Sequence, residues 1–230
     1  MNERIRYPLV ITVICAVAAA ALAYTYALTK DRIRESKRSD LVRGLEKVLP
    51  PEKKSIEMRT LPGVTAREPE DDQKLYIARE NADQTGPALG YAAIGSAQGY
   101  SSKVKVIVGV DTERRIIAAR ILDQQETPGL GERAREVPAT KTLWQALAGL
   151  FHGSEGDGAE LSPPFQQQFS GKTWQQLELT RDADSQDRIV QLTGATITSR
   201  AVVNAAKDAI TKIETALRAK ETAGTKHGGE

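Results

Sequence analysis

One short stretch near the C-terminal end of the chain combines residues that could hold a phosphorylated cofactor. It reads Thr-Gly-Ala-Thr-Ile-Thr-Ser over residues 193–199 and is followed directly by an amphipathic segment. Small residues let a bulky ligand approach the backbone, hydroxyl groups donate and accept hydrogen bonds, and the N-terminus of a helix offers free N–H groups and a positive dipole. The same residues also suit an ordinary loop in which Thr198 or Ser199 caps the helix, so the pattern alone leaves both interpretations open.

Other residue types limit the chemistry that the chain can perform. Its single cysteine, Cys15, lies in an apolar segment, which excludes a disulfide within the chain, a Cys-ligated iron–sulfur cluster and a thiolate zinc site. The two histidines, His152 and His227, lie in a Gly-rich loop and a polar tail, where a metal site or a haem ligand is not expected. No acid–base pair or nucleophile stands out, so we predict no catalytic residue and no metal. Any redox chemistry therefore requires an organic cofactor.

The charge balance argues against a nucleic-acid partner. Of the 230 residues 40% are apolar, which is enough for one packed core. The formal net charge is +2, and Glu3, Arg4 and Arg6 contribute +1 of it, which leaves only +1 for the rest of the chain. A surface that binds nucleic acid would need a larger excess of basic residues.

An uncharged apolar run over residues 8–28 is long enough to span a bilayer. A cleaved signal peptide is the alternative, because Ala21-Leu22-Ala23 has the small-x-small pattern of a cleavage site. The basic residues that follow the run outnumber those before it, so a count of positive charges alone would place the rest of the chain in the cytoplasm. These residues are Lys30, Arg32, Arg34, Lys37 and Arg38.

Hydropathy patterns predict the elements that must position the 193–199 stretch. Strand-like runs cover residues 74–79, 89–94, 104–110 and 116–122. The last two are separated by a polar turn that begins at Asp111, so an antiparallel sheet is favoured. A long helix is expected over 199–217, where apolar residues recur on one face. A short helix is expected over 142–151, followed by an exposed loop over 152–164.

These elements divide the chain into four expected parts. They are a membrane anchor over 1–29, a stalk helix with an irregular lead-in over 30–72, a domain over 73–217 and a polar tail over 218–230. The stalk helix should end at Pro50-Pro51, because proline does not continue a helix. Trp144 and Trp174 are expected to anchor the core of the domain.

Further motifs follow one another in a fixed order along the chain. They are Gly90-Tyr91, Gly99-Tyr100, the run 104–110, Glu126-Thr127-Pro128-Gly129-Leu130-Gly131, Phe169-Ser170-Gly171-Lys172 and the 193–199 stretch. This series resembles the periplasmic FMN-binding subunits of the ion-translocating Rnf and Nqr electron-transport complexes, and most closely the G subunit of the Rnf type. The resemblance implies an α+β fold in which an N-terminal transmembrane helix precedes an FMN-binding domain with an antiparallel sheet and flanking helices.

The resemblance also implies how the cofactor is held. In that family a flavin transferase joins the phosphate of FMN to the last threonine of a hydroxyl-Gly-Ala-Thr motif, which in this chain is Thr196. We therefore expect covalent FMN, linked to Thr196 by a phosphodiester. The other residues expected to bind the cofactor are Thr193, Gly194, Ala195, Thr198, Glu126, Thr127, Gly129, Leu130, Gly131 and Lys172.

The role implied by the resemblance is that of an electron-carrying subunit. The complex would couple electron transfer between ferredoxin and NAD to ion movement, as a redox-driven ion translocase of which this chain is one carrier rather than a complete enzyme. Other membrane subunits and a flavin transferase are the expected partners. The expected location is the bacterial inner membrane, with a single span and the folded domain on the periplasmic side. A membrane-tethered FMN-binding or sensor domain outside such a complex, or a free-standing flavoprotein reductase, remains an alternative.

The chain departs from the family pattern at two positions. Val190 stands where many members have aspartate, three residues before the first hydroxyl of the flavinylation motif. Gln124 stands where the family has histidine, two residues before the glutamate of its Pro-Gly loop. The first difference bears on recognition by the transferase, and the second argues against an essential proton transfer at residue 124.

Overall fold

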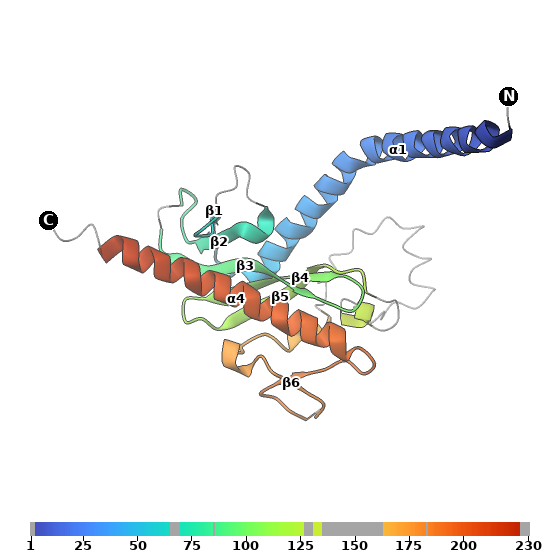
Figure 1. Cartoon of the computed structure of the whole chain (residues 1–230). Coiled ribbons are helices and arrows are strands. Elements are labelled where there is room, and N and C mark those ends of the chain that lie inside the picture. Colours follow the sequence, from blue (N-terminus) through green and yellow to red (C-terminus); the bar gives the residue numbers. More distant parts are fainter. Residues whose placement is uncertain are drawn as a thin grey trace, which may run out of the picture. The chain divides into compact units, whose positions relative to one another are not determined.

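The computed structural model describes residues 3–64, 70–84, 86–126, 131–134, 163–182 and 184–225. The chain divides into two compact units, residues 1–43 and residues 44–230. One long helix, α1 (Glu3–Val48), makes up the first unit, and its last residues belong to the second (Figure 1).

α1 has the composition of a membrane-spanning helix. Over Leu9–Val48 it is long and apolar enough to cross a membrane, and it is the one such helix among the described residues. The side chains over 9–28 are exposed. The hydroxyl groups of Thr25 and Thr29 donate to the carbonyl oxygens four residues before them, at 2.9 and 2.8 Å. These two polar groups are therefore satisfied within the helix, as a hydrocarbon environment requires.

The second unit is built on an antiparallel sheet of five strands, which confirms the predicted fold class. The strands are β1 (Ser55–Thr60), β2 (Lys74–Arg79), β3 (Ala88–Gln98), β4 (Lys103–Asp111) and β5 (Ile116–Asp123). They lie side by side in chain order, each antiparallel to the next. The four runs predicted from hydropathy correspond to β2, β3, β4 and β5.

The first strand was not predicted, because residues 50–72 were expected to form an irregular lead-in. β1 is an edge strand in which Ile56 and Met58 are the only apolar side chains, and Met58 is exposed. A half-exposed edge strand leaves little hydrophobic pattern for a sequence-based prediction. The second compact unit accordingly begins at Gly44, well before residue 73.

Both faces of the sheet are covered, and two glycines permit the close approach of a helix to each face. Along β4 alternate side chains belong to the core that α4 completes; they are Val104, Val106, Val108 and Val110. A Cβ built on Gly95 of β3 would lie 1.9 Å from the carbonyl oxygen of Ala205. On the opposite face, a Cβ built on Gly109 would lie 1.8 Å from the carbonyl oxygen of Val48, in the last turn of α1. Only glycine fits at these two positions.

Short elements connect the sheet to the final helix. They are η1 (Asp71–Gln73), η2 (Gly131–Ala134), α3 (Pro164–Gln167), η3 (Trp174–Gln176), and the paired parallel strands β6 (Leu179–Thr180) and β7 (Ile189–Val190). The helix expected over 142–151, Trp144, and most of the loop expected over 152–164 lie outside the described residues. The prediction that Trp174 anchors the core is wrong, because its side chain is 53% exposed at the start of a short helical turn.

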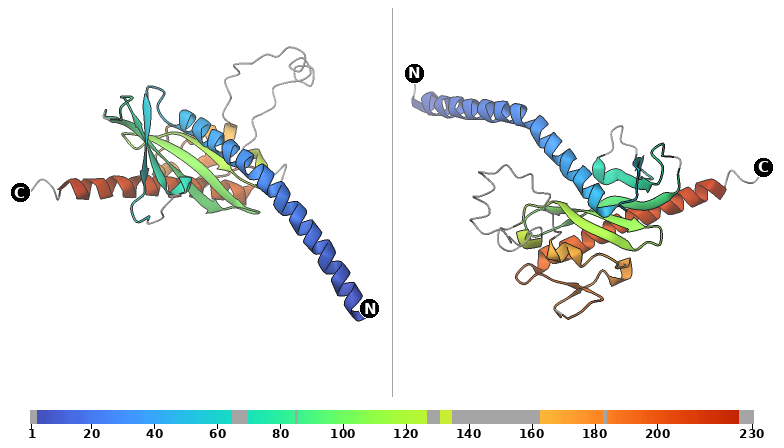
Figure 2. Two further views of the ribbon diagram at one scale, coloured as in Figure 1. Left: turned by 90° about the horizontal axis from the view of Figure 1, so that it is seen from above. Right: turned by 180° about the vertical axis from the view of Figure 1, so that it is seen from behind.

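The final helix, α4 (Thr196–Thr225), lies along the sheet and packs on β3 and β4 (Figure 2). Its buried face includes Val202, Ala206, Ala209, Ile210 and Ile213, as the sequence pattern predicted, and also Ala201, Val203 and Ala205. The helix begins three residues before Ser199 and continues past Leu217 to Thr225, into the expected polar tail. At its N-terminus α4 meets the stretch that the sequence had singled out.

Candidate functional site

A buried carboxylate, Glu126, joins two segments that are far apart in the sequence. It follows β5 and is 7% exposed. Its Oε2 accepts hydrogen bonds from the hydroxyl of Thr198 at 2.6 Å and from the N–H of Tyr100 at 3.2 Å. Its Oε1 accepts from the N–H groups of Ser101 and Ser102, both at 3.2 Å. The carboxylate thus ties the turn between β3 and β4 to the first turn of α4.

Two glycines make room for this cluster of hydrogen bonds. A Cβ built on Gly99 would lie 2.4 Å from Oε1 of Glu126, and one built on Gly131 would lie 2.5 Å from the hydroxyl oxygen of Thr198. Both distances are shorter than any normal contact. A side chain at either position would therefore displace the glutamate or the threonine.

The environment keeps Glu126 ionised although it is buried. Burial alone would raise the pKa of this carboxyl group. The hydrogen bonds from Thr198 and from the N–H groups of Ser102, Tyr100 and Ser101 act in the opposite direction, and they hold the pKa below the ordinary value of 4.5. The site therefore contains a fixed, fully hydrogen-bonded negative charge at neutral pH.

The turn before α4 is held by backbone bonds and by one serine. The N–H of Ala195 donates to the carbonyl of Leu192 at 3.1 Å, and Gly194 has a φ of 80°, which favours glycine. The hydroxyl of Ser199 accepts from the N–H of Leu192 at 3.0 Å and donates to the carbonyl of Ala195 at 2.9 Å. The N–H of Ser199 donates to the same carbonyl at 2.9 Å. Ala195 is therefore the residue that precedes the helix, and neither Thr198 nor Ser199 caps it.

Thr196, as the first residue of α4, differs from the other hydroxyl residues nearby. Its side chain is half-buried, and its hydroxyl forms no hydrogen bond with any part of the chain that the structure describes. Thr198 and Ser199 are buried and hydrogen-bonded, while Thr193 is exposed but lies outside the helix. The first N–H groups of a helix have no partner within it. An anion joined to Thr196 would thus lie beside unused donors at the positive end of α4.

The structure brings together several of the residues predicted to bind the cofactor. Glu126 and Thr198 are hydrogen-bonded to each other, Gly131 lies against both, and Thr193, Gly194, Ala195 and Thr196 form the adjoining turn. Thr127, Gly129 and Leu130 lie outside the described residues.

Lys172 lies apart from this cluster. Its carbonyl oxygen accepts a hydrogen bond at 2.9 Å from the N–H of Ile116, the first residue of β5. Glu126 comes shortly after Asp123, which is the last residue of the same strand. Its amine donates to the carbonyl of Gln186. A strand of this length separates its two ends by roughly 20 Å, so Lys172 is at the far end of β5 from Glu126.

The sequence had not singled out Tyr100, Ser101 and Ser102 as site residues, although Gly99-Tyr100 was among the motifs. All three contact Glu126 through backbone N–H groups, so their side-chain types carry no signal of the contact. Only Gly99, which a Cβ would not fit, marks the turn in the sequence.

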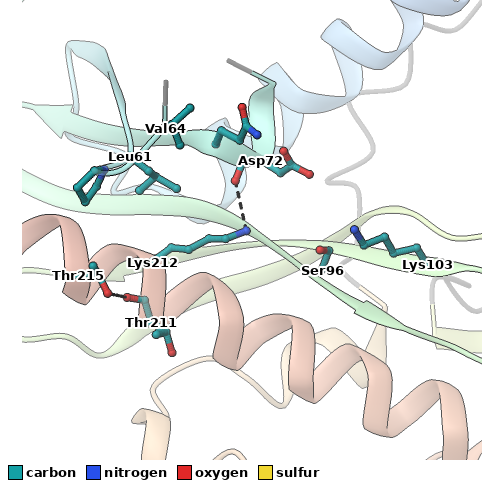
Figure 3. A pocket seen from close by; sticks show the side chains of 10 residues that line it. Leu61, Val64, Asp72, Ser96, Lys103, Thr211, Lys212 and Thr215 are labelled. Atoms are coloured by element: carbon teal, nitrogen blue, oxygen red, sulfur yellow. Dashed lines mark hydrogen bonds between the residues drawn. The ribbon is translucent and has the colours of Figure 1, made fainter. Parts of the chain in front are cut away.

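A cavity of about 450 Å³ lies elsewhere on α4 (Figure 3). The amine of Lys212 points into it and donates to the carbonyl oxygens of Asp72 at 3.3 Å and Ile94 at 2.9 Å. The same amine pairs with Asp208 at 3.0 Å. Thr211, in the lining, lies four helical turns from the start of α4, or roughly 22 Å along the helix. The part of this cavity at Thr211 is therefore far from the first turn of α4, although Lys103 in the lining directly follows Ser102 in the chain.

Comparisons with known proteins show similarity to an FMN-binding domain and to subunits of a membrane oxidoreductase complex. A family model described as FMN-binding domain matches residues 99–211. The G subunit of the ion-translocating oxidoreductase complex of Aliivibrio fischeri is 33% identical over 206 residues, which cover 88% of this chain and 86% of the relative. The G subunit of the same complex from Vibrio atlanticus is 30% identical over 205 residues, with the same coverage of 88% and 86%. The crystal structure of Shewanella oneidensis NqrC is 14% identical, with a TM-score of 0.43 over 78% of this chain and 74% of that chain.

The hydrogen bonds of Glu126 predict a large effect of Glu126→Gln. One of the two carboxylate oxygens becomes an NH₂ group that faces hydrogen-bond donors, so the free energy of unfolding of the full chain in detergent micelles should fall by about 2–4 kcal/mol. Urea denaturation followed by circular dichroism measures this change. Glu178→Gln is the matched control: Glu178 is exposed and pairs with exposed Arg188 at 3.7 Å, so a change below about 0.5 kcal/mol is expected. Equal effects of the two substitutions would contradict the role assigned to Glu126.

The lowered pKa of Glu126 also predicts how this difference depends on pH. A carboxyl group whose pKa is lower in the folded than in the unfolded state stabilises the fold fully above the unfolded value, here about 4.5. That contribution is lost as the pH falls through the lowered folded value. The difference between wild type and Glu126→Gln should therefore be constant near neutral pH and should shrink below pH 4.5.

Proposed function

The chain belongs to the family of G subunits of ion-translocating oxidoreductase complexes, and we propose that it is an FMN-carrying electron-transport subunit of such a complex, with FMN joined covalently to Thr196. The observation that carries the attachment site is the state of the Thr196 hydroxyl, which is accessible and unbonded within the described chain at the first position of α4. Electrons would pass between ferredoxin and NAD through the complex and drive ion movement, with this chain as one carrier.

The geometry of α4 supports Thr196 over its neighbours as the acceptor. The hydroxyl of Thr198 is 2% exposed and already donates to Glu126, so modification there would require the cluster to open. Ser199 is fully buried and holds the turn through two hydrogen bonds. A phosphodiester at Thr196 keeps one negative charge on phosphorus, and the helix end stabilises such a charge by roughly 0.3–1 kcal/mol.

Two exposed apolar side chains next to this position suit the flavin ring. Tyr100, 69% exposed, and Ile197, 52% exposed, belong to the two segments that Glu126 holds together. When bound, the isoalloxazine ring supplies the redox chemistry. The chain would fix the phosphate at Thr196, offer these side chains to the ring and leave part of it open to partners.

α1 supports attachment to a membrane. Its exposed apolar stretch has Tyr7 before it and Tyr24 and Tyr26 near its other end, and tyrosine is enriched at both membrane–water interfaces. We place the protein in a bacterial inner membrane with the folded unit on the periplasmic side, against the count of basic residues after the apolar run. Other membrane subunits of the complex, and a flavin transferase during maturation, are the proposed partners.

Thr196→Ala should abolish covalent flavin, because the alanine has no hydroxyl to esterify. Protein made together with its transferase and denatured should lose in-gel flavin fluorescence, and intact-mass analysis should show the unmodified chain. Thr60→Ala, which removes an exposed threonine from the edge strand β1, is the control and should keep the flavin. Covalent flavin in Thr196→Ala would refute the attachment site.

Tyr100→Ala tests the surroundings of the ring separately from its attachment. Because Tyr100 contacts Glu126 only through its backbone, the substitution should leave folding and flavin attachment intact. Loss of an aromatic surface beside the ring should shift its visible spectrum or reduction potential. Met58→Ala, an exposed side chain on the edge strand β1, serves as the control and should change neither. An unchanged spectrum and potential in Tyr100→Ala would remove this residue from the proposed ring contacts.

A C-terminal reporter fusion tests the proposed orientation. An alkaline phosphatase fused after residue 230 should be active, since that enzyme folds only outside the cytoplasm, and a cytoplasmic fluorescent reporter at the same position should be dark. The reverse pattern would mean that the positive charges after the apolar run determine the orientation.

A further inference from the structure

Basic side chains gather on one side of α1 directly after its apolar stretch. Over residues 30–38 the chain has five basic and two acidic residues, a net charge of +3. Four of the basic residues fall within an arc of about 100° on the helix, because their spacings of 4, 7 and 8 positions match its period. They are Lys30, Arg34, Lys37 and Arg38, which we call the basic face. All four side chains are exposed.

Asp31 and Glu35 precede Arg34 and Arg38 by three positions, but neither acid forms an ion pair with the basic face in the part of the chain that the structure describes. Both acids lie on the adjoining side of the helix, and the ion pairs of the described residues include none of the four basic side chains. Lys30 with Arg34, and Arg34 with Arg38, are like-charge pairs four residues apart, which repel each other. Anions placed beside the helix would relieve this repulsion.

The position of the basic face matches the headgroup layer of a bilayer. The apolar run ends at Leu28, so Lys30 and Arg38 lie roughly 3 and 15 Å further along the helix. The headgroup layer on each side of the hydrocarbon core is about 5–7 Å thick, and charges act over about 8 Å beyond it at physiological salt. All four charges therefore fall within reach of lipid phosphates.

We propose that the basic face binds the headgroups of anionic phospholipids in the leaflet that adjoins the folded unit. The proposal rests on the membrane anchor proposed above, but it does not depend on the flavin. Arginine can hold a phosphate with two parallel hydrogen bonds and lysine acts as a point charge, so together they suit phosphatidylglycerol better than a zwitterionic lipid. This interaction also accounts for basic residues on the side of the membrane where the charge rule does not expect them.

Lipid retention by the full-length protein tests the proposal. Protein in a mild detergent is mixed with equal amounts of phosphatidylglycerol and phosphatidylcholine, and native mass spectrometry counts each bound lipid. Wild type should retain phosphatidylglycerol in an excess of about threefold or more, which should decrease as salt rises. Joint substitution of the basic face, Lys30→Gln, Arg34→Gln, Lys37→Gln and Arg38→Gln, should bring the ratio close to one.

A matched variant controls for total charge. Lys54→Gln, Lys103→Gln, Arg181→Gln and Lys207→Gln remove four exposed basic side chains from the second unit and should keep the wild-type ratio. Equal retention of both lipids by wild type, or an unchanged excess in the basic-face variant, would overturn the proposal. So would loss of copurifying membrane subunits with an unchanged lipid ratio, since an acidic protein surface would then be the partner. Thr196→Ala should keep the wild-type lipid ratio, so a failure of the flavin assignment remains distinguishable.

Discussion

Four hydrogen bonds converge on the carboxylate of Glu126, and the candidate site depends on them. The donors come from the turn between β3 and β4 and from the first turn of α4, segments about a hundred residues apart in the chain. Within the described part of the chain, no other side-chain hydrogen bond joins these two segments. Burying a carboxylate destabilises the folded state unless hydrogen bonds compensate its charge. One of the hydrogen bonds that do so here comes from Thr198 and therefore also positions this residue, which lies two residues after Thr196.

The position of α4 along the sheet is fixed by a close contact at Gly95, and this position places the N-terminal turn of the helix near Glu126. Gly95 lets the helix backbone approach β3 so closely that the carbonyl of Ala205 occupies the place of a side chain. A helix seated in this way cannot slide along the sheet without meeting the side chains on either side of Gly95. The N-terminal turn of α4 is thereby held at the end of the sheet where Glu126 lies. The small residues of the buried face permit this close packing, so they contribute to the position of the site as well as to the core.

Sequence patterns predicted the elements with regular periodicity and missed those without it. The valines of β4 and the apolar face of α4 repeat at the periods of a strand and a helix, so both elements were predicted. The edge strand β1 and the exposed position of Trp174 depend on tertiary packing, which leaves no local pattern. Within the site the motif residues could be named from the sequence, but the backbone donors to Glu126 could not, because a main-chain N–H group is present in every residue except proline.

Because α1 is one continuous helix, removing it to make the protein soluble would also remove side chains from the core of the second unit. The helix that carries the apolar stretch also supplies Leu45 and Val48, which are 5% and 0% exposed in the core of the second unit. Each buried side chain of this kind stabilises a fold by about 1.5–3 kcal/mol, so a fragment that begins after α1 would lose a substantial share of a domain's net stability. A water-soluble version of the second unit must therefore retain the last turn of α1, and a protease that releases this unit intact must cut before Gly44.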